Sequence, residues 1–282
     1  MANAWVIDAR SYDASTDLKK STLFQSEAIK EFLEAPQSAG AVVIAPKGCG
    51  KTLLIKHKRK LMEAEDYLLL PHGQMVDVNP GTASQFSNED LHAIESTPDF
   101  WSQLWQISIC ISVLRAVENK QALEPLLDVD PMLVNGSLET TFELFEHLLK
   151  TQIKSFSRLY DVFRTHVRPA YRQDHGTRVA VFIDNIDEFF SPHLQYTTKA
   201  EHGIARDRFY GQLSRSFWDS AQVGFLLAAR ALKALNPHIK VFGAIRSEAL
   251  NSFSASVPEL VNARALLVDL DYGYEELREI FE

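Results

Sequence analysis

Apolar residues form five short, nearly continuous runs along the chain, and each run is long enough for one β-strand. The runs cover residues 41–46, 66–71, 178–184, 239–245 and 265–270. Such runs are typical of strands buried on both faces, as strands are in a parallel sheet. The pattern therefore predicts an α/β fold with a five-stranded, mostly parallel sheet.

The segments between these runs carry apolar residues at helical spacing. They are residues 22–34, 53–65, 99–120, 138–166, 206–235 and 247–253. The segment 138–166 fits either one long helix or a pair of helices. Because strands and helices alternate, we expect helices to cover both faces of the sheet.

This interpretation assigns the whole chain, residues 1–282, to a single domain. Its core comprises about residues 22–70 and 178–282, and the mainly helical stretch from about 71 to 177 is a large insertion between two strands of that core. The residues 72–90 lack any period and are expected to form a long loop within the insertion.

The composition is that of a globular domain and does not by itself indicate a function. Of the 282 residues, 46% are apolar and 23% are charged, and the formal net charge is −8. A negative charge gives no general attraction to nucleic acid, although a local patch would still allow it. Cys49 and Cys110 are the only cysteines and lack CxxC spacing, which argues against a disulfide framework or a zinc knuckle. We find no targeting segment or membrane-spanning run, and we expect a cytoplasmic protein with no membrane partner.

A short basic sequence with two glycines follows the first predicted strand directly. Its residues are Ala45, Pro46, Lys47, Gly48, Cys49, Gly50, Lys51 and Thr52. Gly48 and Gly50 allow successive backbone N–H groups to turn inward and form an anion-binding nest. The helix that follows adds the positive end of its dipole at the same place.

This sequence resembles the P-loop, or Walker A motif, whose usual form is GxxxxGK[ST]. Ala45 stands at the first glycine position, which is a mild departure. The resemblance implies that residues 46–52 cradle the phosphates of a nucleotide. Lys51 would reach the β- and γ-phosphates, and the Thr52 hydroxyl would bind Mg²⁺. Cys49 is interpreted as a small loop residue rather than as a redox switch.

A second set of candidate residues follows the apolar run 178–184, because hydrolysis needs carboxylates as well as a phosphate site. Asp184 ends that run and would hold the Mg²⁺ water shell opposite Thr52. Asp187 is our first candidate for the general base that activates water, and Glu188 is the second.

The segment Phe182–Glu188 resembles the Walker B element of STAND-class NTPases, particularly the NACHT and KAP-like pattern. Asn185 replaces the glycine of that pattern, and its position also differs from AAA+ proteins, in which Glu directly follows the metal-binding Asp. The resemblance covers about residues 40–270. It implies the additional-strand type of P-loop NTPase, in which a further strand lies beside the P-loop strand. Arg246 follows the run 239–245 and would then be a sensor of the γ-phosphate.

The resemblance implies an ATP- and Mg²⁺-dependent switch that hydrolyses ATP and forms a homo-oligomer, or contacts a protein partner, in its ATP-bound state. By family analogy alone, a bacterial defence or signalling role follows. Residues Asn119–Ala122 fail to match the guanine-reading NKxD motif, which favours adenine. Family members place a lid region after the core, and the chain has no room for it. We therefore expect a longer protein of which this is the N-terminal part.

Three alternatives remain open at this point. They are a DNA-transaction ATPase that regulates transposition or replication, a nucleotide-binding scaffold that does not hydrolyse ATP, and, as a last resort, a small-molecule kinase. The basic run Lys56–Lys60 would serve the first alternative, but a solvated helix face is the favoured interpretation. Arg206, Arg208 and Arg230 are candidates for an arginine finger supplied by another subunit, and the sequence does not choose among them.

Overall fold

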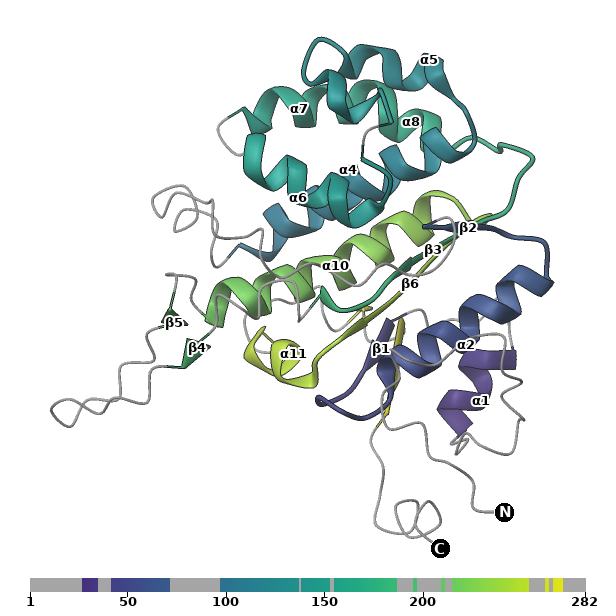
Figure 1. Cartoon of the computed structure of the whole chain (residues 1–282), viewed down its shortest axis with the longest axis vertical. Coiled ribbons are helices and arrows are strands. Elements are labelled where there is room, and N and C mark those ends of the chain that lie inside the picture. The colour runs from purple at the N-terminus through teal and green to yellow at the C-terminus, as the bar shows by residue number, and fades with distance from the viewer. Residues whose placement is uncertain are drawn as a thin grey trace, which may run out of the picture.

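The protein is described by a computed structural model (Figure 1), which places ten segments of the chain. They are residues 27–34, 42–71, 97–136, 138–152, 155–186, 195–196, 209–210, 215–253, 262–263 and 266–270. Within these segments no helix has the length and apolar character needed to span a lipid bilayer.

The five predicted strands form one sheet in which every pairing is parallel, so this prediction is confirmed. The strands are β1 (Val42–Ile44), β2 (Leu68–Leu70), β3 (Val179–Ile183), β6 (Ile239–Ile245) and β7 (Leu267–Asp269). Their order across the sheet is β2-β3-β6-β1-β7. The strand β6 therefore lies between β1 and β3, beside the strand that leads into the glycine-containing sequence.

One face of the sheet is covered by α1 (Glu27–Glu34) and α2 (Lys51–Ala64), which lie together below the sheet in Figure 1. Alternate residues of the strands, such as Val43, Ala180 and Phe242, form a core with these two helices. This alternation follows from the period of two residues in a β-strand.

The other face is covered by α10 (Arg215–Leu235) and α11 (Ser247–Phe253), with α4 (Pro98–Ala116) packed on the outer side of α10 (Figure 1). Strand residues that alternate with those of the first face, such as Val181 and Ile245, belong to this larger core. Helices thus cover both faces, as the alternation of elements predicts.

In the described residues between β2 and β3, the regular elements are all helices, joined by turns and short irregular stretches. It comprises α4, α5 (Lys120–Leu123), η3 (Glu124–Leu126), η4 (Pro131–Leu133), α6 (Thr141–Thr151), α7 (Phe156–Val162), the π-helical η5 (Phe163–Val167) and α8 (Arg168–Tyr171). The segment 138–166 therefore contains more than one helix. The first of them starts with a capping box, in which Thr140 and Glu143 each accept from the backbone of the other.

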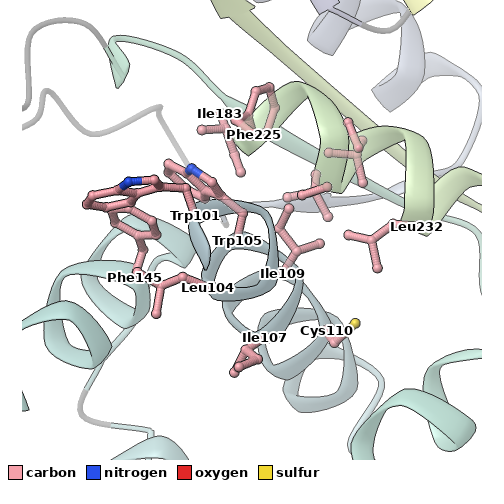
Figure 2. Close-up of a cluster of buried hydrophobic side chains, with 14 of the residues drawn as sticks. Trp101, Leu104, Trp105, Ile107, Ile109, Cys110, Phe145, Ile183, Phe225 and Leu232 are labelled. Atoms are coloured by element: carbon pink, nitrogen blue, oxygen red, sulfur yellow. The ribbon is translucent and has the colours of Figure 1, made fainter. Parts of the chain in front are cut away.

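Tight packing joins this helical segment to α10 (Figure 2). The ring of Trp105 stacks on Phe145 of α6 at a centroid distance of 3.8 Å, and its indole N–H donates to the Ala221 carbonyl of α10 at 3.0 Å. At Gly224 of α10 an added Cβ would lie 2.3 Å from the Cβ of Trp101. Trp101 and Trp105 of α4 are therefore packing residues.

A separate antiparallel pair corrects one helix prediction. Strands β4 (Gln195–Tyr196) and β5 (Phe209–Tyr210) pair with each other. The predicted helix 206–235 is therefore wrong at residues 209–210, and α10 begins only at Arg215. Adjacent aromatic residues favour an extended backbone, and the ladder partner that decides the matter is distant in sequence.

Candidate functional site

The glycine-containing sequence forms a loop at one edge of the sheet, between β1 and α2. We call residues 45–50 the 45–50 loop. Because all five strands are parallel, their carboxyl ends meet at this edge, where α/β proteins commonly bind ligands. The Ala45 N–H donates to the Ile245 carbonyl of β6 at 3.4 Å, which ties the start of the loop to the neighbouring strand. Residues 46–48 are exposed.

The two glycines of the loop adopt left-handed backbone conformations. The φ angle is +88° at Gly48 and +82° at Gly50, and a Cβ at either position would meet nothing within 4 Å. Glycine is therefore required at both positions by the backbone conformation. No neighbouring atom occupies the space where a side chain would begin. Gly50 is the N-cap of α2 and supplies no side-chain acceptor to the first turn. The first turn of a helix carries N–H groups that suit an anion.

Lys51 lies beneath the loop and is only 9% exposed. Its Nζ donates to the Ala45 carbonyl at 3.1 Å and to the Pro46 carbonyl at 2.8 Å. The ammonium group is therefore held at the start of the loop, on the same side as the first turn of α2. Thr52 follows in that first turn and is half-buried, as is Cys49 in the loop. The sequence-predicted residues 46–52 are therefore contiguous at the end of β1 and the start of α2, with the Lys51 ammonium group bound to the first two carbonyls of the loop.

Asp184 lies at the same edge of the sheet, directly after β3. It is 7% exposed, and its Oδ2 atom is buried. One strand, β6, separates β3 from β1, so the two strand axes are roughly 10 Å apart. The next residue, Asn185, has a φ of +60°, a conformation that asparagine adopts more readily than most residues. The chain therefore turns sharply after Asp184.

Several other predicted residues fall outside the part of the chain that the structure describes. They are Asp187, Glu188, Arg206 and Arg208. Arg230 is described and lies in the second half of α10, toward the edge at which the strands begin. Arg230 therefore lies at the opposite edge of the sheet from the 45–50 loop.

The basic run on α2 corrects a prediction, because its central residues do not form a solvated face. Lys58 is only 1% exposed, and its Nζ donates to the Phe32 carbonyl at 2.6 Å and lies 5.5 Å from the Phe242 ring centroid. Burial lowers the pKa of Lys58 from 10.5 to about 8. Arg59 donates to the Pro71 carbonyl at 2.6 Å and lies 5.5 Å from the Phe182 ring centroid.

These two cations fix α2 against the strands that carry the other candidate residues. Phe182 and Phe242 stack on each other at 5.1 Å in β3 and β6, and the two basic side chains cover them. Cation–π contacts of this kind strengthen when they are removed from water. These contacts hold α2, which starts at Lys51, against the two strands that lead to Asp184 and Arg246.

Arg246 directly follows β6 and is half-buried at the same edge. Its guanidinium carbon lies 5.2 Å from the ring centroid of Trp218 in α10, and its backbone N–H donates to the Gln222 Oε1 at 2.8 Å. No motif in the sequence connects Arg246 with Trp218 and Gln222. The spacing of Trp218 and Gln222, one helical turn apart, is a weak signal, since it shows only that both lie on one helix face.

The donors for a metal ion are few among the residues whose positions the structure gives. In that part of the chain no group of three or more His, Cys, Asp or Glu side chains is arranged to hold a metal ion. Thr52 and Asp184 are one hydroxyl and one carboxylate. Mg²⁺ is commonly bound by one or two carboxylates together with substrate phosphates and water, so this donor set fits Mg²⁺ only in company with a phosphate ligand.

Comparison with protein-family models, with curated proteins and with solved structures finds no match to this chain. The roles of the residues at this edge of the sheet therefore rest on their own geometry and chemistry.

Proposed function

We propose that the chain binds ATP with Mg²⁺ at the 45–50 loop and hydrolyses it. The observation that carries the proposal is the loop itself. Two glycines at positive φ, an uncapped helix start and a buried lysine ammonium converge at the carboxyl edge of a parallel sheet. Oligophosphates are the ligands that this combination suits best.

Phosphate binding would draw on the main chain before any side chain. The N–H groups of residues 48–52 donate to the phosphate oxygens, and the open space at Gly48 and Gly50 admits them without a clash. Lys51 exchanges the Ala45 and Pro46 carbonyls for the β- and γ-phosphate oxygens. A charged acceptor replaces a neutral one in this exchange, which strengthens the hydrogen bonds.

A magnesium ion would be held by the Thr52 hydroxyl, by the phosphates and, through water, by Asp184. When bound, the ion neutralises negative charge on the β- and γ-phosphate oxygens. The position of Asp184 supports this role, because it follows β3 at the carboxyl edge of the sheet, one strand away from the strand of the loop. Asp187 is proposed to activate the attacking water, with Glu188 as the second candidate.

The strand order supports the additional-strand type of P-loop NTPase, because β6 lies between the strand of the loop and the strand of Asp184. Within that type we propose the STAND class, on the strength of the residues 182–188. The proposal includes a cytoplasmic switch in which ATP binding promotes a homo-oligomer or exposes a surface for a protein partner. The DNA-transaction alternative loses part of its basis, since Lys58 and Arg59 are engaged within the protein.

Steady-state phosphate release tests the hydrolytic part of the proposal. We expect Mg²⁺-dependent turnover of ATP by the parent chain and its loss in both Lys51→Ala and the double variant Asp187→Ala/Glu188→Ala. Nucleotide binding should be lost only with Lys51→Ala. ATP binding without turnover in the parent would favour the non-hydrolysing scaffold, and turnover that survives loss of both acidic residues would refute their assignment.

A further inference from the structure

The arginine after β6 lies level with the start of the 45–50 loop. In the register of the parallel pair, Ile44 is opposite Ile245, and the Ala45 N–H donates to the Ile245 carbonyl. Arg246 therefore leaves the sheet beside the loop, about 5 Å away, which is the spacing between neighbouring strands. This position is within reach of a terminal phosphate in the loop for a side chain as long as arginine.

Two residues of α10 hold Arg246 from its backbone and from its side chain. Gln222 is fully buried, at 0% exposure, and its Oε1 accepts from the Arg246 N–H at 2.8 Å. Trp218 is 6% exposed and presents its ring to the guanidinium, with the centroid 5.2 Å from the guanidinium carbon. The Gln222 Nε2 in turn donates to the Trp218 carbonyl at 3.4 Å.

The buried amide of Gln222 indicates that this arrangement is specific. A buried amide costs free energy unless its donor and acceptor are both used. Here the acceptor takes the backbone N–H at the exact end of β6, and the donor points back along its own helix. A leucine or methionine would fill the same volume without that cost, but it would leave the first residue after the strand without this acceptor.

The cation–π contact with Trp218 is compatible with phosphate binding by the same guanidinium. The contact with an aromatic ring uses the face of the guanidinium, whereas its five N–H groups lie in the plane and point outward. A ring that covers the face restricts the rotation of the side chain. It thereby lowers the entropy that Arg246 would lose when it donates to a phosphate.

We propose that Trp218 and Gln222 are positioning residues that orient Arg246 toward the terminal phosphate of a bound nucleotide, so that the site favours triphosphate over diphosphate. This inference rests on the proposed nucleotide binding at the 45–50 loop. It adds the two residues of α10 that set the preference. A merely structural role for Trp218 would instead change the affinities for ATP and ADP equally, through the stability of α10.

The test compares the dissociation constants of Mg·ATP and Mg·ADP for the 282-residue chain and its variants, measured by calorimetric titration. We expect Arg246→Ala to weaken ATP binding about tenfold and to leave ADP binding within about twofold, as is common for the loss of one charged contact. Trp218→Leu should weaken ATP binding about three- to tenfold. Trp218→Phe keeps an aromatic face, and its ATP affinity should stay within about twofold of that of the parent.

Further variants separate a positioning role from an effect on stability. Trp105→Phe removes a buried indole of α4 that donates to Ala221 of α10, the helix that carries Trp218, but does not touch Arg246. It should leave the ratio of the ATP and ADP affinities unchanged. The double variant Trp218→Leu/Arg246→Ala should be no worse than Arg246→Ala alone, because both changes remove the same contact. Gln222→Met provides a second positioning variant if Trp218→Leu does not fold, and it should also weaken ATP binding selectively.

The outcomes distinguish this inference from the proposed function. Equal weakening of ATP and ADP by Trp218→Leu, or by Gln222→Met in its place, would overturn the positioning role while leaving nucleotide binding intact. Additive losses in the double variant would overturn it as well. If the parent bound neither nucleotide, the proposed function would fail, and the inference would fail with it.

Discussion

The 45–50 loop and the helix layer on the far side of the sheet both depend on glycine, but for opposite reasons. Gly48 and Gly50 have positive φ angles, and a Cβ at either position would meet nothing within 4 Å. Gly224 and Gly243 are not among the described glycines with positive φ, yet a Cβ there would lie 2.3 Å and 2.4 Å from atoms of neighbouring aromatic residues. One region needs an unusual backbone, and the other needs the absence of a side chain.

This difference separates the part of the molecule that can accept a ligand from the part that holds it together. The loop has its special conformation in open space at an exposed edge, where a ligand can approach. The layer of α4 and α10 is closed, because the backbones of the two helices approach too closely for even a methyl group. Substitutions in the two regions should therefore affect different measurements.

The largest effect on stability is expected in the closed layer. Gly224→Ala places a methyl group 2.3 Å from the Trp101 Cβ and 2.9 Å from the Ser102 backbone nitrogen, so α10 must move away from α4. We expect a loss of about 3 kcal/mol in the free energy of unfolding, more than the gain in helix propensity from alanine. Urea denaturation measures it, and an unchanged or raised midpoint would show that the two helices do not pack this closely.

A smaller effect on stability is expected in the loop. Gly50→Ala meets no neighbouring atom and pays only for the left-handed backbone, about 1–2 kcal/mol. Its effect on Mg·ATP binding should be larger than that of Gly224→Ala, because relaxation of φ turns the backbone N–H groups away from the phosphates. A larger loss of Mg·ATP affinity with Gly224→Ala than with Gly50→Ala would reverse the comparison.

The smallest effect concerns the buried lysine on α2 and appears as a pH dependence. The pKa of Lys58 is about 8 in the folded protein and 10.5 in its ordinary state, so the unfolded chain binds more protons between these values. The free energy of unfolding therefore increases as pH rises from about 8 toward 10.5. This contribution is lost again as pH falls back to about 8.

Lys58→Met keeps the apolar stem and removes the titration. Between pH 7 and pH 9 the parent should gain about 1 kcal/mol in unfolding free energy relative to this variant. Lys60→Met on the same helix, where the lysine is exposed, makes the same charge change and should follow the parent. An identical pH profile for Lys58→Met and the parent would mean that the ammonium group is solvated.

Local patterns predict most of the sheet and the loop. The apolar runs 178–184 and 239–245 contain β3 and β6, because strands buried on both faces leave an uninterrupted apolar signature. Gly48, Gly50 and Lys51 are recognisable because the loop is continuous in sequence, and its chemistry depends on neighbours along the chain.

Contacts between distant segments account for the features of the site that the sequence does not predict. Lys58 and Arg59 stand in a run of basic residues that suggests a solvated face, and only the rings of two separate strands make their burial favourable. Likewise, Arg246 contacts Trp218 of α10, and no local pattern links these two residues. A single sequence contains no signal for such pairs, since each residue also satisfies a simpler local role.

The central claim is that the 45–50 loop and Lys51 bind the phosphates of ATP. Calorimetric titration of Mg·ATP into the parent, Lys51→Met and Lys60→Met tests it most directly, because both substitutions remove one positive charge from α2. The account predicts saturable binding to the parent and Lys60→Met, and at least about tenfold weaker binding to a folded Lys51→Met. Equal affinity for all three proteins would contradict it.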